Sequence, residues 1–460
     1  MILLCRAQAP PVNQVRHDVR EMIVYATAMF ERLKALQNRP WIVALLLGIA
    51  AQTLFTVHLD RPSRIMFDEV HYVPAAQALL ALEGPRNIEH PLVGKELIGA
   101  GILFFGDNPA GWRASTALAG TATVLAAFAF LWLLVGSMRA AVVGSLLTAM
   151  NQTLYVQART AMLDVFLGAF LLWAMVVMLW AMRGTPGQAK RRWIGAAILF
   201  GLAVGTKWAA IPYVALAGLA FLFVRLRDAR RAKRPSLSAL SGKDQPHWPG
   251  LSTIPGLLIL GTVSILTYLA TFFPAFFYER DPLTLAGLLP LQRDMYALQT
   301  QILAHHTYQS DWWSWPLMIR PIWYFYEWDE GAQRGVLLIG NPVIMWGGLI
   351  AVLACLWAGF REKAIRPLAI ALLWIASLAI YVVIPKSIGF YYYYHLSGLF
   401  LCLALAVAFD HFDRGKGKGR EEWFLFAALA MFVYFYPILA ASALPDTQGF
   451  QKWMWLPTWP

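Results

Sequence analysis

Eleven apolar runs, bounded by charged residues, most constrain what this chain can fold into. A helix needs about 20 apolar residues to cross roughly 30 Å of hydrocarbon. We expect spans near 41–58, 114–135, 140–157, 165–182, 193–206, 208–224, 252–277, 336–359, 367–384, 390–409 and 423–442. The shorter run 97–105 predicts a helix lying at the membrane surface instead. The predicted fold class is an all-α integral membrane protein with about 11 transmembrane helices.

The distribution of charge predicts which way these spans face, because loops rich in lysine and arginine stay cytoplasmic. With the N-terminus inside, the inner segments hold 25 of the 38 basic residues and 10 of the 26 acidic ones. The formal charge of +12 therefore divides into +15 inside and −3 outside. We interpret it as a topology signal and expect no nucleic-acid partner. The sequence predicts a multi-pass protein of the inner (plasma) membrane.

This topology predicts five segments. Residues 1–40 are expected to form an uncleaved cytoplasmic segment, with an amphipathic helix over Met22–Leu36 that lies on the inner leaflet. The segments after it are an N-terminal membrane module 41–277 with a first outer loop 59–113, an aromatic-rich outer loop 278–335, a four-helix module 336–442 and an outer tail 443–460.

Chemically versatile side chains collect on the predicted outer side. They are Asp68, Glu69, His71, His90, Lys95, Arg113, Arg159, Asp164, Lys207, Lys386, Tyr394 and His395. A carboxylate beside apolar residues can have a raised pKa and act as a general base. Cations at the hydrocarbon boundary suit the phosphate of a lipid carrier. The set predicts transfer of a group from such a carrier to an outer acceptor.

Each member of this set also has a simpler explanation. Asp68 and Glu69 also fit a solvated or helix-capping pair, and Asp164 also fits a partner for a helix dipole. Lys207 and Lys386 also fit side chains that only extend to the membrane surface. The adjacent histidines 305 and 306 lack a third ligand at a recognisable spacing, so no metal site is predicted. Joint placement on one side of the membrane favours a functional site.

Six motifs in order resemble the protein O-mannosyltransferase family, over about residues 41–442. They are Phe67-Asp68-Glu69-x-His71-Tyr72, His90-Pro91-x-x-Gly94-Lys95, Gly111-Trp112-Arg113, Ala158-Arg159-x-x-x-Leu163-Asp164, Thr206-Lys207-Trp208 and Tyr392-Tyr393-x-His395. The resemblance implies the GT-C glycosyltransferase architecture. It also implies transfer of a sugar, expected to be mannose, from a polyprenyl-phosphate carrier to a hydroxyl acceptor, expected to be serine or threonine of exported proteins.

The resemblance also implies roles for single residues. Asp68 is expected to be the catalytic base, assisted or positioned by Glu69, while Asp164 orients the first outer loop or the acceptor. Binding of the donor is expected from His71, His90, Lys95, Arg113, Arg159, Lys207, Lys386, Tyr394 and His395, with Lys95 and Arg159 ranked first for the phosphate. One base implies a single displacement with inversion, unlike the two-carboxylate retaining glycosidases. No cofactor and no metal are expected, and the partners are the carrier, an exported protein and membrane lipids.

Two departures from the family pattern matter. Leu92 stands where the family usually has a second proline, and loop 278–335 is too short for the β-trefoil domain of eukaryotic members. The chain is therefore similar to the compact bacterial branch, for which the sugar, the acceptor and the oligomeric state stay open.

Three other functions remain as alternatives. A transporter or flippase would place charged side chains near the middle of the membrane, whereas the eleven predicted spans have none in their interiors. A carrier-dependent transferase that modifies lipid A shares the fold, but Gly94-Lys95 and the run Tyr391–His395 favour a protein acceptor. A non-enzymatic binding module predicts that the acidic pair is dispensable.

Overall fold

The computed structural model describes residues 39–235, 241–242, 245–384, 386–413 and 419–460. The chain divides into two compact units, Met1–Leu46 and Leu47–Pro460. In the first unit, the described residues 40–46 begin helix α2. The amphipathic helix predicted over Met22–Leu36 lies outside the described residues.

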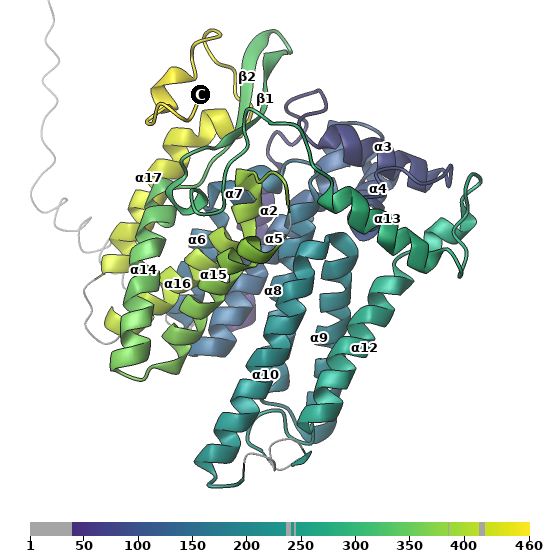
Figure 1. The fold of residues 1–460 in the computed structure, drawn as a ribbon. Helices are drawn as coiled ribbons and strands as arrows, with labels where there is room; N and C mark the ends of the chain where they lie inside the picture. Colours follow the sequence, from purple (N-terminus) through teal and green to yellow (C-terminus); the bar gives the residue numbers. More distant parts are fainter. Residues whose placement is uncertain (1–38, 236–240, 243–244, 385, 414–418) are drawn as a thin grey trace, which may run out of the picture. The chain divides into compact units, whose positions relative to one another are not determined.

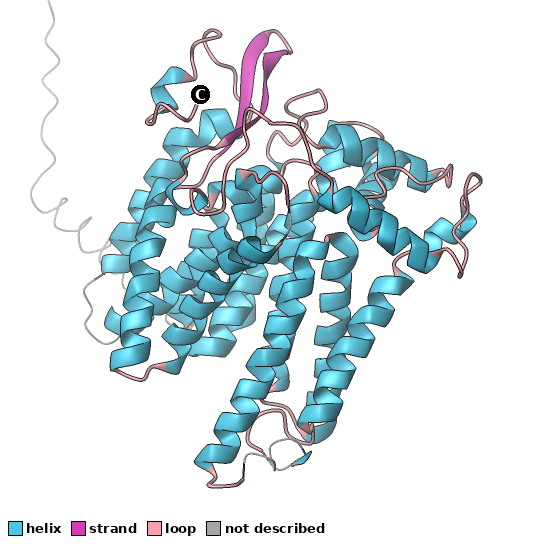
Figure 2. Cartoon of the chain, viewed as in Figure 1, coloured by secondary structure: helices cyan, strands magenta, loops and turns pink. Residues whose placement is uncertain are grey.

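The second unit is mainly helical (Figures 1 and 2). Its helices are the rest of α2 (Pro40–Thr56), α3 (Glu69–Leu80), α4 (Val93–Phe105), α5 (Pro109–Val135), α6 (Met138–Ala149), α7 (Gln152–Gln157), α8 (Leu163–Ala181), α9 (Pro186–Thr206), α10 (Ile211–Arg231), α12 (Thr253–Ala270), α13 (Leu288–Thr300), α14 (Pro342–Arg361), α15 (Ile365–Val383), α16 (His395–Asp413) and α17 (Arg420–Leu439). Short 3-10 helices are η1 (Trp208–Ala210), η2 (Phe273–Phe277), η3 (Trp315–Leu317), η4 (Tyr391–Tyr394) and η5 (Gln451–Trp453).

The chain is a multi-pass membrane protein. Among the described residues, 8 helical segments are long and apolar enough to cross a membrane. Helices α2 and α6 are apolar but shorter, with 17 and 12 residues. The predicted span 193–206 lies within α9, which begins earlier, at Pro186. The number of eleven spans stays a prediction.

Local capping residues explain where the helices begin and end. The Asn108 side chain accepts a hydrogen bond from the Gly111 amide, and Pro109 occupies the first position of α5. Gly136, with φ of 76°, ends the helix in the left-handed conformation. Helix α5 therefore starts before the predicted residue 114. The prediction followed only the apolar run, whereas the first turn of the helix, next to its polar cap, is not part of that run.

The structure corrects the span predicted over 140–157. The segment forms two helices, α6 and α7, in place of one continuous helix, because Asn151 caps the start of α7. Its side-chain oxygen accepts hydrogen bonds from both the amide and the hydroxyl of Thr153. Asparagine satisfies free amides at a helix start better than it continues a helix.

A β-hairpin in the outer loop 278–335 and just beyond it departs from the all-α expectation. Strand β1 (Ile322–Asp329) pairs antiparallel with β2 (Ala332–Leu338). The turn residues Glu330 and Gly331 have φ of 48° and 74°, as two-residue hairpin turns require. Strand β2 therefore occupies the first residues of the span predicted from 336, and α14 begins only at Pro342.

Helices α8 and α16 form the interior of this unit. Helix α8 packs on α5 and α9, α9 packs on α12, and α16 packs on α14, α15 and α6. Helices α3, α4 and α13, the hairpin and the C-terminus gather at one end of these long helices (Figure 1). Any site built from the loops that are predicted to lie outside is therefore at this end.

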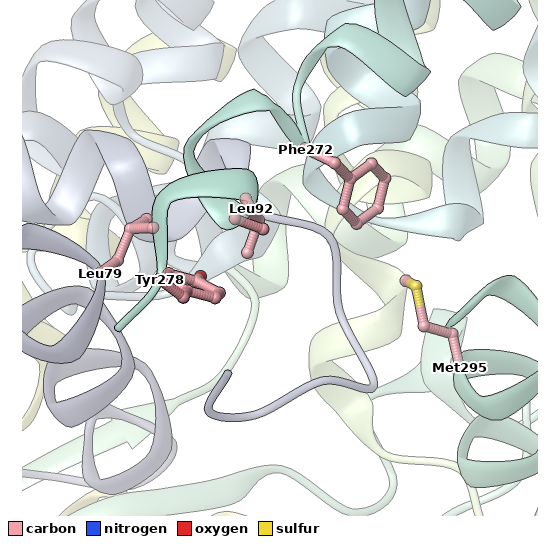
Figure 3. Packing of buried hydrophobic residues seen from close by; sticks show 6 residues of the cluster. Leu79, Leu92, Phe272, Tyr278 and Met295 are labelled. Atoms are coloured by element: carbon pink, nitrogen blue, oxygen red, sulfur yellow. The ribbon is translucent and has the colours of Figure 1, made fainter. Parts of the chain in front are cut away.

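An apolar cluster joins the first outer loop to the loop before the hairpin. Leu79 of α3 and Leu92 pack with Phe272, Tyr278 and Met295, all of which are buried (Figure 3). Burial of this apolar surface holds α13 against the segment that precedes α4. The cluster fixes the two outer segments that carry polar residues relative to each other.

Candidate active site

Asp68 lies at the start of α3, directly after a residue with unusual backbone geometry. Phe67 has φ of 48°, a conformation that bulky residues adopt only when their surroundings enforce it. Asp68 is half-buried, and the Tyr72 hydroxyl donates a long hydrogen bond of 3.5 Å to its Oδ2 atom. In the described part of the chain, Asp68 forms no ion pair, so its carboxylate is available to a substrate.

Burial raises the pKa of Asp68 to about 6, and the nearby Asp164 carboxylate acts in the same direction. Lys207 and His71 oppose this shift, because their positive charge favours the ionised form. A carboxylate with this pKa is ionised at neutral pH and still accepts a proton better than an ordinary aspartate. These are the properties of a general base.

The pKa of Asp68 predicts the pH dependence of the reaction. A base must be ionised to act, so kcat/KM is expected to fall as the pH drops through 6 and to be about tenfold below its plateau at pH 5. A pH profile of kcat/KM between pH 4.5 and 8 measures this. The fall should persist in His71→Gln, whose side chain no longer titrates. A plateau that extends down to pH 5 contradicts the assignment.

Asp164 and Lys207 form a buried ion pair beside Asp68. Asp164 lies in the first turn of α8, and Lys207 lies between α9 and η1. The lysine Nζ lies 3.0 and 2.9 Å from the two carboxylate oxygens of Asp164. Burial alone lowers the pKa of Lys207, but the charge and hydrogen bond of Asp164, together with Tyr393 and Asp68, raise it, and the pKa lies above its usual value. Lys207 therefore stays charged at neutral pH.

Aromatic rings surround the two carboxylates. The Phe67 ring stacks on Tyr324 of β1, with centroids 4.1 Å apart and planes at 7°, and meets Tyr392 edge-on at 5.7 Å. The Lys207 ammonium lies 5.2 Å from the Tyr392 ring centroid and 5.4 Å from that of Tyr393. Aromatic faces of this kind bind the C–H faces of sugars and attract cations.

His90 and Lys386 approach the site through a shared glutamine. Gln299 of α13 donates to the Nδ1 atom of His90 at 3.1 Å and to the Glu89 carbonyl at 2.5 Å, while its own carbonyl accepts from Lys386 at 2.9 Å. Burial, with Lys207 next in importance, holds the pKa of His90 well below its usual value, so the ring is neutral. Lys386 is exposed, as is His71.

The rings of Phe67, Tyr324, Tyr392 and Tyr393 are called the aromatic cradle below. Glu69 and Arg113 point away from this cradle and toward each other. Both are fully buried, and Arg113 donates to both oxygens of Glu69 at 2.7 and 2.8 Å. The other three guanidinium hydrogens go to the carbonyls of Leu59, Pro62 and Arg64. All five donors of Arg113 are therefore used. This geometry favours a positioning role for the pair, in place of the substrate contact expected of Arg113.

Glu69 also connects two chain segments that flank the site. Its oxygens accept hydrogen bonds from the Met66 amide at 3.0 Å and the Ala161 amide at 2.8 Å. The residue next to the proposed base is therefore tied to the segment that leads into α8. Glu69 positions the start of α3, consistent with the second of its two expected roles.

Arg159 and Lys95, ranked first for phosphate binding, are both buried and hold backbone carbonyls. Arg159 donates to the carbonyls of Phe55, Val57 and His58, at the end of α2. Lys95 donates to the carbonyls of Arg86, Asn87 and His90, which uses all three of its hydrogens. Its pKa falls to about 7, chiefly because of burial.

Gly94 explains why a glycine precedes Lys95 in its motif. A Cβ atom at residue 94 would lie 2.4 Å from the Cδ2 atom of Leu163, closer than carbon atoms can approach. The glycine lets the start of α4 touch the start of α8. The motif Gly94-Lys95 thus serves packing and loop closure in this structure.

Tyr394 and His395 lie deeper in the bundle. The Tyr394 hydroxyl accepts a hydrogen bond from the Trp374 indole at 3.3 Å. His395 packs against Gly168 of α8, one turn beyond Asp164, and neither of its ring nitrogens has a hydrogen-bond partner among the described residues. Of these two predicted contacts, only His395 has free polar atoms beside the carboxylates.

An apolar groove of about 800 Å³ lies between α9, α10 and α12. Its walls include Leu219, Leu260 and Ile265, and its end is formed by Trp208, Tyr268 and Gln292. The Trp208 indole donates to the Tyr268 hydroxyl at 2.9 Å, and that hydroxyl donates to Gln292. Trp208 follows Lys207 directly in the chain, so one residue of the groove wall is the sequence neighbour of the cation of the site.

Sequence reasoning missed two residues of the site, Gln299 and Tyr324. The run Ile322–Asp329 is rich in aromatic residues and is followed by Glu330-Gly331, a recognisable strand and turn signal that points to Tyr324. No local pattern marks Gln299. Within the described ranges, no group of three or more His, Cys, Asp and Glu side chains is arranged to hold a metal ion. The expected absence of a metal stays a prediction.

Comparison with solved structures identifies the class of protein. The fold is similar to the S. cerevisiae protein O-mannosyltransferase Pmt1-Pmt2 complex bound to the sugar donor, with a TM-score of 0.76 and 14% identity over 92% of this chain and 93% of that one. ArnT from Cupriavidus metallidurans, in the apo state, aligns with a TM-score of 0.54 and 16% identity over 87% of this chain and 65% of that one. The protein therefore has the fold of the integral-membrane GT-C class.

The sequence comparisons identify the family. Residues 63–277 match the model for dolichyl-phosphate-mannose-protein mannosyltransferase, and residues 284–459 match the C-terminal four TMM region of protein-O-mannosyltransferase. The chain belongs to the protein O-mannosyltransferase family. It is similar to polyprenol-phosphate-mannose–protein mannosyltransferases of Mycobacterium tuberculosis (27% identity, 92% of both chains) and Corynebacterium glutamicum (26% identity, 86% of this chain and 88% of the relative).

Proposed function

We propose that this enzyme transfers mannose from a polyprenyl-phosphate carrier to serine or threonine hydroxyls of exported proteins on the outer face of the inner membrane. The names of its bacterial relatives support this donor and a protein acceptor. They favour a protein over lipid A as acceptor. The N-terminus is cytoplasmic in this proposal, in line with the excess of basic residues in the inner loops.

The observation that carries the proposal is the position of Lys207. Its ammonium pairs with Asp164 beside the base Asp68, and the next residue, Trp208, lines the apolar groove. A lipid-linked phosphate needs these two environments side by side, because its tail prefers hydrocarbon and its phosphate prefers a fixed cation. The groove supports binding of the polyprenyl tail, and Lys207 and Lys386 support binding of the phosphate.

The mechanism is a single displacement at the anomeric carbon. Asp68 takes the proton of the acceptor hydroxyl while the acceptor oxygen bonds to the anomeric carbon. The bond from that carbon to the phosphate oxygen breaks, and its electron pair stays on the phosphate. Lys207 and Lys386 stabilise this developing charge. The configuration inverts, and Asp68 suffices as the one base.

The test uses right-side-out membrane vesicles that contain the enzyme and polyprenyl-phosphate mannose. A membrane-impermeant peptide with serine and threonine is expected to gain one hexose without permeabilisation, with the anomeric configuration opposite to that of the donor. Mass spectrometry of the peptide reports sugar and acceptor together. Mannose that appears only in a glycolipid, or transfer only after permeabilisation, contradicts the proposed acceptor or face.

Lys386→Ala is expected to raise the KM for the polyprenyl-phosphate donor about tenfold and to leave the KM for the peptide unchanged. Its ammonium is exposed, lies 5.6 Å from the Tyr393 ring centroid and donates one hydrogen bond, to Gln299, so two of its three hydrogens remain for a phosphate. Loss of one charge-assisted contact costs about this factor. Initial rates at varied donor concentration measure it. Lys452→Ala in the C-terminal tail is the matched control, and equal behaviour of both variants removes Lys386 from the phosphate site.

A further inference from the structure

Tyr324 has a buried hydroxyl that no group in the described part of the chain satisfies. The side chain is only 4% exposed, and its oxygen has no hydrogen-bond partner there. A buried polar atom without a partner is unfavourable and rare in folded proteins. Such an atom is retained when a ligand supplies the missing partner. No sequence motif of the family resemblance includes this residue.

The ring of Tyr324 is fixed by two sets of contacts. It stacks on Phe67, the residue that directly precedes Asp68. Strand β1 is also tied to the first outer loop, because the amide and hydroxyl of Ser63 donate to Asp329 at 2.9 and 2.5 Å. Arg64 and Glu327 add an exposed ion pair across the same boundary. The hydroxyl therefore has a defined direction.

Both carboxylates of the site lie near this side chain, which stacks on the neighbour of Asp68. Burial raises the pKa of Tyr324 well above its usual value, and Asp164 and Asp68 add to the shift because both lie near its hydroxyl. Asp164 is held by Lys207, on the side proposed for the phosphate, whereas Asp68 faces the acceptor. In a single displacement, the sugar lies between the leaving phosphate and the attacking oxygen. A group that lies near both carboxylates is therefore next to the position that the sugar occupies.

We propose that Tyr324 is a sugar-binding residue, whose hydroxyl donates a hydrogen bond to one hydroxyl oxygen of the mannose that is transferred. This inference rests on the proposed function, and it adds a contact to the sugar itself. The phenol is a donor with a fixed direction, so it distinguishes sugars by the position of that oxygen. The ring of the same residue holds Phe67, and with it the loop that carries Asp68.

The experiment combines one conservative variant with altered donors. Wild-type enzyme, Tyr324→Phe and Tyr326→Phe are each assayed with polyprenyl-phosphate mannose and with its 2-, 3-, 4- and 6-deoxy derivatives. Tyr326 is the matched control on the same strand, because its hydroxyl donates to the Thr447 carbonyl at 3.0 Å. Melting temperatures of all three proteins check that the variants fold.

With the mannose donor, Tyr324→Phe is expected to lower kcat/KM about tenfold. One deoxy donor is expected to lower the wild-type value by a similar factor but to cause no further loss in Tyr324→Phe, since the same contact is already absent. Tyr326→Phe should respond to every donor as the wild type does. If each deoxy donor lowers all three enzymes by equal factors, Tyr324 does not contact the sugar. Wild-type enzyme that transfers no mannose overturns the proposed function itself.

Discussion

Replacing Asp68 by asparagine is expected to lower mannosyl transfer by about 10³-fold. The amide has nearly the same shape as the carboxylate but cannot accept the proton of the acceptor hydroxyl. General-base catalysis typically contributes about 10² to 10⁴-fold. The raised pKa, near 6, makes Asp68 a stronger base than an ordinary aspartate, so a loss in the middle of this range is expected. Initial rates of peptide mannosylation with saturating donor measure the change.

Asp294→Asn is the control for this substitution. Asp294 lies on α13, on the same side of the molecule, and is exposed, so its variant should transfer mannose at the wild-type rate. Donor binding should survive in Asp68→Asn, since the groove and Lys207 are unchanged. A loss of only a few-fold would mean that Asp68 positions the acceptor and that another group takes the proton.

The pattern of apolar runs predicted the membrane helices well, for a physical reason. Crossing hydrocarbon requires length and low polarity, and both are visible in the sequence. The ends of the helices were less predictable. Polar caps such as Asn108 and Asn151 start helices whose other residues are mainly apolar, so a search for apolar runs does not find them. The hairpin was not predicted, because its strands are rich in aromatic residues, which are also common at the membrane surface.

The contrast between Asp68 and Glu69 shows what sequence does not reveal about a site. The two are adjacent, yet successive residues at a helix start point in directions about 100° apart. Asp68 therefore faces the aromatic cradle, while Glu69 faces the interior and meets Arg113. A motif identifies both as important but does not separate a chemical role from a positioning role.

Cations raise the same difficulty, and only three-dimensional contacts resolve it. Arg113, Arg159 and Lys95 occupy family motifs just as Lys207 does. Their hydrogens are donated to backbone carbonyls or to Glu69. These acceptors lie either far away along the chain or in irregular loops. Such acceptors leave no trace in the sequence. Tyr324 is similar, because its role follows from a contact with Phe67 across most of the chain.

Arg113→Ala is expected to destabilise the folded protein by about 3–5 kcal/mol and to reduce the amount of folded enzyme. Removing the guanidinium leaves the Glu69 carboxylate buried at 0% exposure without its partner, which is the costly case for a buried ion pair. Three carbonyls of the first outer loop also lose their donor. Thermal unfolding in detergent, followed by size-exclusion chromatography, measures the change.

Arg280→Ala is the matched control, because Arg280 is exposed and its loss should change stability by less than about 0.5 kcal/mol. The variant Glu69→Gln should destabilise the protein as Arg113→Ala does. The double variant should lose less stability than the sum of the two single losses, because both substitutions remove the same interaction. A phosphate-binding arginine makes a different prediction. Arg113→Ala would then fold with a normal melting temperature and show a raised KM for the donor, and the positioning role would be wrong.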